Sequence, residues 1–265
     1  KIENSMTKIH YVEEGKGDLT LLFIHGWCIN SSYWSSQIKY FSRQYKVIAI
    51  DLPGFGKSTS IRNEWTIEKY GEDIINVIEK LQLNNVILIG HSMSGEIMLE
   101  AALKKHKSII GLVGVDNFKM IDVQFSQEQL EEMTSFFDQL EKDFSNMGPV
   151  YADRMLFHTS TDNTVRTRVK NDISNTDPQV GCLSLAGLIK YGMSEPAKLS
   201  ELNYKLFLIN SDAIPTNIIG LEKHCKSSFE ILNIHTTGHY PMIEKTDEFN
   251  RLLELVIQKI NQKSK

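Results

Sequence analysis

Short apolar runs alternate with amphipathic segments along the first part of the chain. The runs are rich in β-branched residues and are continuously apolar, a pattern typical of parallel strands buried on both faces. The segments between them repeat their apolar residues every three or four positions, as helices do. Strands are therefore predicted at 8–13, 19–25, 46–51, 86–90 and 109–115, and helices at 31–41, 65–81 and 93–105.

This alternation breaks at Asp116. From Phe118 to Leu202 helical patterns dominate, and one helix is expected to begin at Asp177-Pro178, because proline suits the first turn of a helix. Strand and helix patterns then resume, with strands predicted at 205–210 and 229–234 and helices from 217 and at 247–263.

The pattern predicts one α/β domain with a mostly parallel, doubly wound sheet. Its core would consist of residues 1–117 and 203–265, and a helical insertion, the cap, would occupy 118–202. Because core strands flank the cap, we expect it at the carboxyl edge of the sheet, where open α/β sheets bind ligands.

Composition and charge narrow the class of protein. The 265 residues are 41% hydrophobic and 23% charged, as in ordinary globular proteins. A net charge of −4 disfavours a nucleic-acid partner, and no apolar run is long enough to span a bilayer. No signal-peptide pattern is present, although the chain begins at Lys1 and a removed leader stays possible. The sequence carries no signal for an oligomeric state.

The cysteines favour a reducing compartment. Cys28, Cys182 and Cys225 are widely spaced and odd in number, so neither a disulfide framework nor a zinc site is expected. We therefore expect a cytoplasmic protein.

The segment "GHSMSG" (90–95) suggests a nucleophile. A predicted strand runs into Ser92 and a predicted helix leaves it, which resembles the Gly-x-Ser-x-Gly turn of serine hydrolases, although Ser94 stands at the last glycine position and Gly95 follows it. A serine there would lie above the sheet, close to the amides and the dipole of the following helix. The alternative is a purely structural Gly-Ser turn.

A histidine and two aspartates could complete a triad. His239, in "TTGHYPM", follows a predicted strand and could act as general base. Asp116 in "GVDNF" and Asp212 in "INSDAIP" both end strands, and either could orient the imidazole. His235 lies four positions before His239, but a glycine and a strand end between them argue against a helical zinc pair.

Two other segments follow strands. In "HGW", backbone amides after the strand could join the amide of Met93 in an oxyanion hole, with His25 bracing the loop. "GKS" at 56–58 is not a phosphate-binding loop, because Asp51 stands where such a loop needs a glycine.

Taken together, "HGW", "DLPGFGKS", "GHSMSG" and "TTGHYPMIEK" resemble the α/β-hydrolases in their order and spacing, from Lys8 to the last helix. The resemblance implies a mostly parallel sheet, helices on both faces and a helical cap after the sixth strand. It also implies that Ser92 is the nucleophile, His239 the base, and the amides of Trp27 and Met93 the oxyanion hole.

The resemblance implies Asp212 as the acid, because the family usually carries it after the seventh strand. The turn Asn210-Ser211-Asp212 is one residue shorter than the usual Gly-x-x-Asp. Some relatives take the acid from the strand before the cap, so Asp116 is the alternative.

The function expected is that of a small bacterial esterase-like serine hydrolase, which cleaves a carboxylic ester or thioester through an acyl-enzyme without a metal or cofactor. An apolar, ester-like small molecule is the expected partner, contacted by Trp27, His25, Phe118 and Tyr240. The alternatives are a C–C hydrolase, an acyltransferase or a lyase on the same triad, or a small-ligand receptor that keeps the fold.

Overall fold

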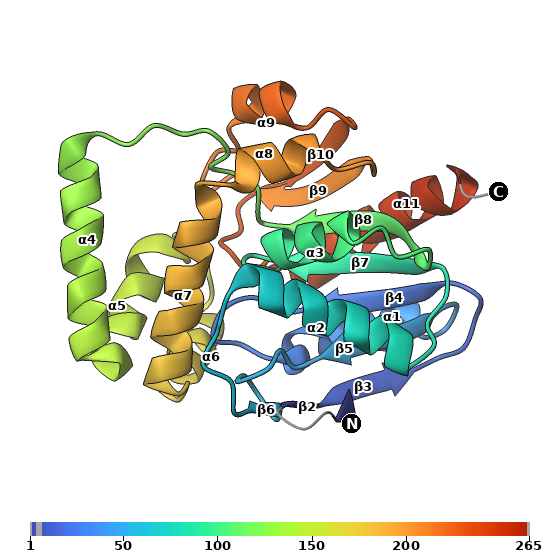
Figure 1. Cartoon of the computed structure of the whole chain (residues 1–265), viewed down its shortest axis with the longest axis horizontal. Coiled ribbons are helices and arrows are strands. Elements are labelled where there is room, and N and C mark those ends of the chain that lie inside the picture. Colours follow the sequence, from blue (N-terminus) through green and yellow to red (C-terminus); the bar gives the residue numbers. More distant parts are fainter. Residues whose placement is uncertain (1, 4–6, 264–265) are drawn as a thin grey trace.

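A seven-stranded sheet forms the centre of the molecule (Figure 1). The computed structural model describes residues 2–3 and 7–263. The strand order is β10-β9-β8-β7-β4-β5-β3, and every pair is parallel except β3 with β5. This confirms the mostly parallel sheet. The strands are β3 (Tyr11–Glu14), β4 (Thr20–Ile24), β5 (Lys46–Ile50), β7 (Val86–His91), β8 (Ile109–Val115), β9 (Leu206–Ser211) and β10 (Phe229–Ile234). A smaller sheet joins β1 (Ile2–Glu3), β2 (Thr7–Ile9) and β6 (Thr59–Ser60).

Helices cover both faces of the large sheet, as a doubly wound fold requires (Figure 1). On one face lie α2 (Ile67–Lys80) and α3 (Ser94–Leu103), and on the other lie α1 (Ser35–Phe41), which follows the 3₁₀ turn η1 (Ser31–Trp34), and α11 (Thr246–Lys263). The middle strands are consequently buried throughout, which explains their continuous apolar runs.

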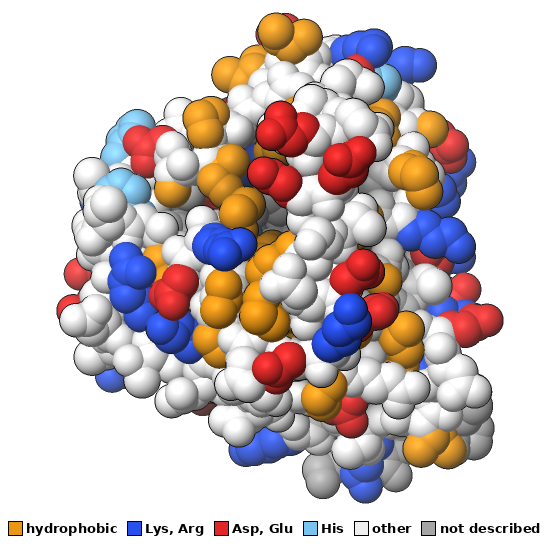
Figure 2. Space-filling model, turned by 90° about the vertical axis from the view of Figure 1, so that its left-hand side faces the viewer, with side chains coloured by type: hydrophobic (Ala, Val, Ile, Leu, Met, Phe, Trp, Pro, Cys, Tyr) orange, Lys and Arg blue, Asp and Glu red, His pale blue; other side chains and the backbone are white. Residues whose placement is uncertain are grey.

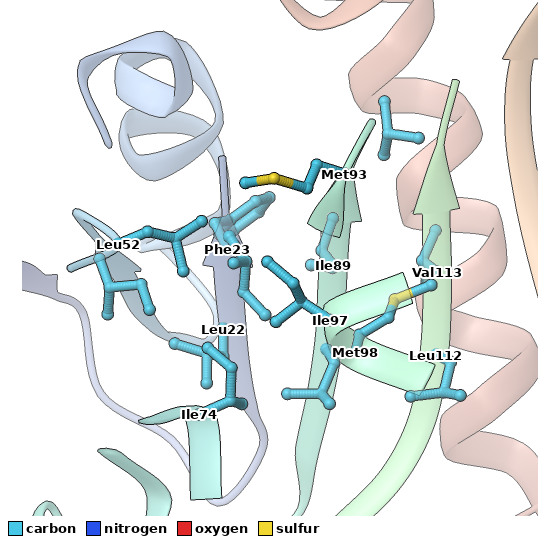
Figure 3. Close-up of a cluster of buried hydrophobic side chains, with 14 of the residues drawn as sticks. Leu22, Phe23, Leu52, Ile74, Ile89, Met93, Ile97, Met98, Leu112 and Val113 are labelled. Carbon is cyan, nitrogen blue, oxygen red and sulfur yellow. The ribbon is translucent and has the colours of Figure 1, made fainter. Parts of the chain in front are cut away.

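The core between the sheet and α3 holds the strand ends in place. Figure 3 shows Ile97 and Met98 of α3 against Ile89 of β7 and Leu112 of β8. All four side chains are fully buried. This packed layer supports the strand ends at which the candidate site lies.

The segment between β8 and β9 is helical, and no strand occurs among its described residues. It consists of α4 (Gln127–Lys142), α5 (Phe144–Met155), α6 (Asn163–Ser174), α7 (Pro178–Gly192) and α8 (Glu195–Ser200). Figure 1 shows α4 to α7 grouped at the carboxyl edge of the sheet, with α8 above α3. The predicted helix start is confirmed, since the Asp177 side chain caps α7 by accepting hydrogen bonds from the amides of Gln179 and Val180.

The strand that precedes this helical segment is the predicted one. When the two-residue strands β1 and β6 are set aside, β8 is the sixth strand of the chain. The boundaries 1–117, 118–202 and 203–265 stay a prediction, and residues 1, 4–6 and 264–265 lie outside the described residues.

Two short helices, α9 (Ile218–His224) and α10 (Pro241–Glu244), flank β10. No helix in the described part of the chain is long and apolar enough to cross a membrane.

We expect Leu88→Ala to destabilise the fold by about 2–5 kcal/mol, because the cavity left in a packed core adds to the lost burial. Leu88 is fully buried on β7, between β4 and β8. Urea unfolding at equilibrium measures the change. Ile61→Ala is the control, because that side chain is 78% exposed and its loss should change stability by less than about 0.5 kcal/mol. Equal effects of the two substitutions would contradict the proposed core.

Candidate active site

Ser92 lies on a tight turn between β7 and α3. Its φ of 53° is in the left-handed region, which costs free energy for a residue with a Cβ. The Ser92 amide donates to the Val115 carbonyl over 2.9 Å, and the Gly95 amide donates to the Ser92 carbonyl over 2.8 Å. The predicted strand-to-helix turn is therefore present, with its serine held in a strained conformation from both sides.

The unusual order of Ser94 and Gly95 has a packing explanation. A Cβ at Gly90 would lie 2.2 Å from the Ser94 carbonyl oxygen, and one at Gly95 would lie 2.5 Å from Asn117 Nδ2. These two positions therefore need glycine, whereas position 94 has room for a hydroxyl. The Ser94 hydroxyl donates to the His25 carbonyl over 2.5 Å and so ties the turn to the "HGW" loop.

His239 lies between a hydroxyl and a carboxylate. Its Nε2 is 2.7 Å from Ser92 Oγ, and its Nδ1 is 2.6 Å from Asp116 Oδ2. Because an ionised carboxylate can only accept, Nδ1 carries a hydrogen and donates a hydrogen bond to Asp116. Nε2 is then left to accept the hydrogen of the Ser92 hydroxyl, which is the tautomer that a general base needs.

The main chain of His239 is held by the core and by the helical segment. Its amide donates to the Leu156 carbonyl over 2.9 Å, and its carbonyl accepts from His91 Nε2 over 2.7 Å. Burial lowers the pKa of His91 to about 3, so this ring stays neutral near pH 7. The loop that carries His239 is thus fixed from two directions.

Asp116 is a buried carboxylate with several donors. Its Oδ1 accepts from the Ser211 amide over 2.8 Å and lies 2.5 Å from Lys119 Nζ. Burial on its own would raise the pKa of Asp116, but the hydrogen bonds and positive charges of His239 and Lys119 outweigh it and hold the pKa well below its usual range. Asp116 is therefore ionised near pH 7.

The prediction that Asp212 lies against His239 is wrong. Its Oδ2 is 2.7 Å from Nδ1 of His235, and both side chains are largely exposed. The pairing of strands explains the difference: His91 is opposite Val115, which places Ser92 beside Asp116 on adjacent strands. In the same way Ser211 of β9 is opposite Ile234 of β10, which places Asp212 beside His235 on the next pair of strands. The alternative acid, Asp116, occupies the position.

Trp27 and Met93 line the same cavity as Ser92. In the described part of the chain neither of their amides donates a hydrogen bond to another protein group. Met93 directly precedes the first turn of α3. Their role as an oxyanion hole stays a prediction.

The cavity above Ser92 has a volume of about 300 Å³ and is mostly apolar. Phe118 and Tyr240, both expected to contact substrate, lie in its wall, together with Tyr151 of α5. The Trp27 indole also lines it and donates to the Gly181 carbonyl of α7 over 2.9 Å. Core and cap residues thus enclose the serine together.

The prediction that His25 contacts substrate is wrong, because its ring is fully buried and is not part of the cavity wall. Nδ1 donates to the Gly26 carbonyl over 2.7 Å, so Nε2 accepts the Leu52 amide over 2.8 Å. The expectation that His25 braces its loop is confirmed by these bonds.

Sequence reasoning missed several residues of this site. Asn117 donates through Nδ2 to the carbonyls of Gly90 and Ser92, which stabilises the strained turn. Lys119 holds Asp116 and also donates to the Ser211 carbonyl over 2.9 Å. Their position directly after Asp116 in "DNFK" was the available signal. In the ranges 2–3 and 7–263, no group of three His, Cys, Asp or Glu side chains comes together as a metal site.

Comparisons with known proteins agree with this fold. The family model described as "alpha/beta hydrolase fold" matches residues 20–176. An esterase structure from Thermogutta terrifontis superimposes with a TM-score of 0.81 over 96% of this chain and 94% of that one, at 20% identity.

Two of the curated relatives match the chain over very different lengths. The chain is 26% identical to the pimeloyl-[acyl-carrier protein] methyl ester esterase of Wigglesworthia glossinidia brevipalpis over 93% of this chain and 96% of that protein. It is 39% identical to the (E)-2-((N-methylformamido)methylene)succinate hydrolase of Acinetobacter baylyi, but that match spans only about a third of either protein, 35% of each. The fold and the family match confirm the resemblance: the chain belongs to the α/β-hydrolase fold family.

Proposed function

We propose that this protein is a serine hydrolase that cleaves a carboxylic ester or thioester through an acyl-enzyme. The observation that carries the proposal is the continuous hydrogen-bonded array from Ser92 Oγ through His239 to Asp116. Hydroxyl, imidazole and carboxylate in this order are the groups that acyl transfer needs.

The proposed reaction begins when Ser92 Oγ attacks the substrate carbonyl and His239 Nε2 takes the hydroxyl proton. The amides of Trp27 and Met93 stabilise the negative charge that forms on the carbonyl oxygen. His239 then gives its proton to the departing alcohol or thiol, which leaves an acyl group on Ser92. A water molecule removes that group by the same two steps, so no metal or cofactor takes part.

Asp116 acts in the proposed reaction through His239. It holds the imidazole in the tautomer with a proton on Nδ1 and stabilises the imidazolium that forms during attack. Lys119 and the Ser211 amide keep the carboxylate in position and ionised, since both contact its other oxygen.

The cavity favours an apolar, ester-like substrate of small size. Its volume of about 300 Å³ matches the lower end of small-molecule sites, and Trp27, Phe118 and Tyr240 give it aromatic walls. The name of the Wigglesworthia relative, a methyl ester esterase aligned over 93% of the chain, supports ester bonds rather than C–C bonds.

We expect the protein to hydrolyse p-nitrophenyl esters of short acyl chains and to react with a fluorophosphonate at Ser92. Ser92→Ala should remove both activities while the protein still unfolds at the wild-type temperature, because only the bond-forming oxygen is lost. Release of p-nitrophenol and intact mass measure the two reactions. A full-mass adduct on Ser92→Ala would assign the nucleophile to another residue.

We expect Asp116→Asn to lower kcat by about 10⁴-fold, because the amide no longer selects the reactive tautomer of His239. Asp212→Asn is the matched control and should keep most of the activity, since its carboxylate lies against His235 instead. Steady-state kinetics on one ester compares them, at a temperature where melting curves show both variants folded. The opposite ranking would make Asp212 the acid.

A further inference from the structure

A second acidic group lies in the wall of the catalytic cavity. Glu96, on the first turn of α3, and Glu195, the first residue of α8, both line it together with Ser92. Glu195 also lines a second hollow of about 840 Å³ between α4 and α7. Figure 2 shows hydrophobic side chains gathered in the middle of that face of the molecule, with charged side chains around them. The pair therefore lies where the two hollows meet.

The two carboxyl groups line the same cavity, and each has a buried oxygen without a donor. The Glu195 side chain is buried, with only 8% of the residue exposed. Glu195 Oε1 and Glu96 Oε2 are buried, and no described protein group donates to them. Burial disfavours the charged form of both carboxyls, and two neighbouring negative charges repel each other. The pair therefore favours keeping one proton while no cation is bound.

The cations near this pair are engaged elsewhere. Lys198 of α8 lies 2.8 Å from Glu100, which also accepts the Tyr191 hydroxyl over 2.9 Å. In the cavity wall, Lys119 is held by Asp116. No ion pair links Glu96 or Glu195 to a Lys, Arg or His side chain in the described part of the chain. Three titratable groups lie on the elements next to the pair: Glu100, Tyr191 and Lys198. The other titratable residues that line the two hollows are His91, Asp116, Lys119, Asp122, Glu141, Tyr151, Cys182, Lys190, His239 and Tyr240.

A buried carboxyl pair without a cation is costly for a fold. Removing a charge from water costs several kcal/mol unless it is paired, and an apolar side chain would fill the same wall without that cost. Glu100, one turn farther along α3, has both a lysine and a tyrosine, so the structure does supply partners where a glutamate is structural. This contrast indicates that the missing partner of Glu96 and Glu195 comes from a ligand.

We propose that Glu96 and Glu195 bind a positively charged amine on an otherwise apolar substrate, while the ester carbonyl of that substrate lies at Ser92. An ammonium group donates hydrogen bonds to both carboxyls and supplies the missing charge, and the proton of the pair leaves to solvent as it binds. The ester part of this assignment rests on the proposed function, whereas amine binding does not.

The pH dependence of amine binding follows from the same groups. Burial, and then the charge of Glu195, raise the pKa of Glu96 well above its usual value, and burial raises the pKa of Glu195 to about 7. An alkylammonium keeps its proton up to about pH 10. As the pH rises from about 6 to about 8, the pair therefore gains negative charge while the ligand stays positive, and the preference for an amine over a neutral isostere should grow.

The test uses the full-length Ser92→Ala protein, which cannot turn over a substrate, with n-hexylamine and its isostere n-hexanol as probes. Calorimetry at constant ionic strength, near pH 6 and pH 8, gives both dissociation constants. We expect n-hexylamine to bind about 10-fold more tightly than n-hexanol near pH 8, and the ratio to be smaller near pH 6.

Two further substitutions in the Ser92→Ala background locate the effect. Glu195→Gln keeps the shape of the side chain. It should bring the ratio of the n-hexanol and n-hexylamine dissociation constants close to one, as should Glu96→Gln. Glu201→Gln is the matched control, because Glu201 is an exposed glutamate directly after α8, and it should keep the preference for the amine. Melting curves establish that each variant is folded.

Equal affinity for the two probes in the Ser92→Ala protein would overturn the proposal, as would an amine preference that persists in Glu195→Gln and Glu96→Gln. The ester and fluorophosphonate experiments are separate. If Ser92 proved inert while the amine preference depended on Glu195, the hydrolase proposal would fail and the amine site would stand. An active serine without amine preference would give the reverse conclusion.

Discussion

The parallel pairing of β7 with β8 fixes the geometry of the cavity around Ser92. His91 is opposite Val115, and the chain continues the ladder for one more bond, from the Ser92 amide to the Val115 carbonyl. Each strand then turns sharply in the left-handed region, with φ of 53° at Ser92 and 51° at Asp116. Such conformations persist only where the surroundings determine them. Here Asn117 ties the two turns together through the Gly90 and Ser92 carbonyls, so the hydroxyl and the carboxylate lie a fixed distance apart, with room for one imidazole between them.

The helical segment completes that geometry as well as covering it. The Leu156 carbonyl accepts the His239 amide, and the Gly181 carbonyl accepts the Trp27 indole. Farther out, the Tyr33 hydroxyl donates to Asp172 of α6 over 2.7 Å. A movement of the cap away from the sheet would therefore break bonds that position His239 and one wall of the cavity.

Local signals in the sequence were enough to predict the strand ends and the placement of Ser92 and His239 directly after strands. Each of these depends on a run of apolar residues followed by a turn, which a short window contains. The choice between Asp116 and Asp212 depends instead on which strands are neighbours and on their register. The order β10-β9-β8-β7 places β8, and not β9, beside the serine, and no pattern within either segment records that order.

The same limit applies to the acidic groups of the cavity. Asp116 and the pair Glu96–Glu195 line one small cavity, yet the structure treats their carboxyls in opposite ways. Asp116 has a lysine, a histidine and an amide as donors, which lower its pKa, whereas burial without a cation raises the pKa values of Glu96 and Glu195. The difference arises because Lys119 follows Asp116 on the same loop, while α8 brings only Glu195 to Glu96 from a distant part of the sequence. One carboxylate is thereby kept charged beside His239, and in our proposal the other two keep a proton that a bound ammonium displaces.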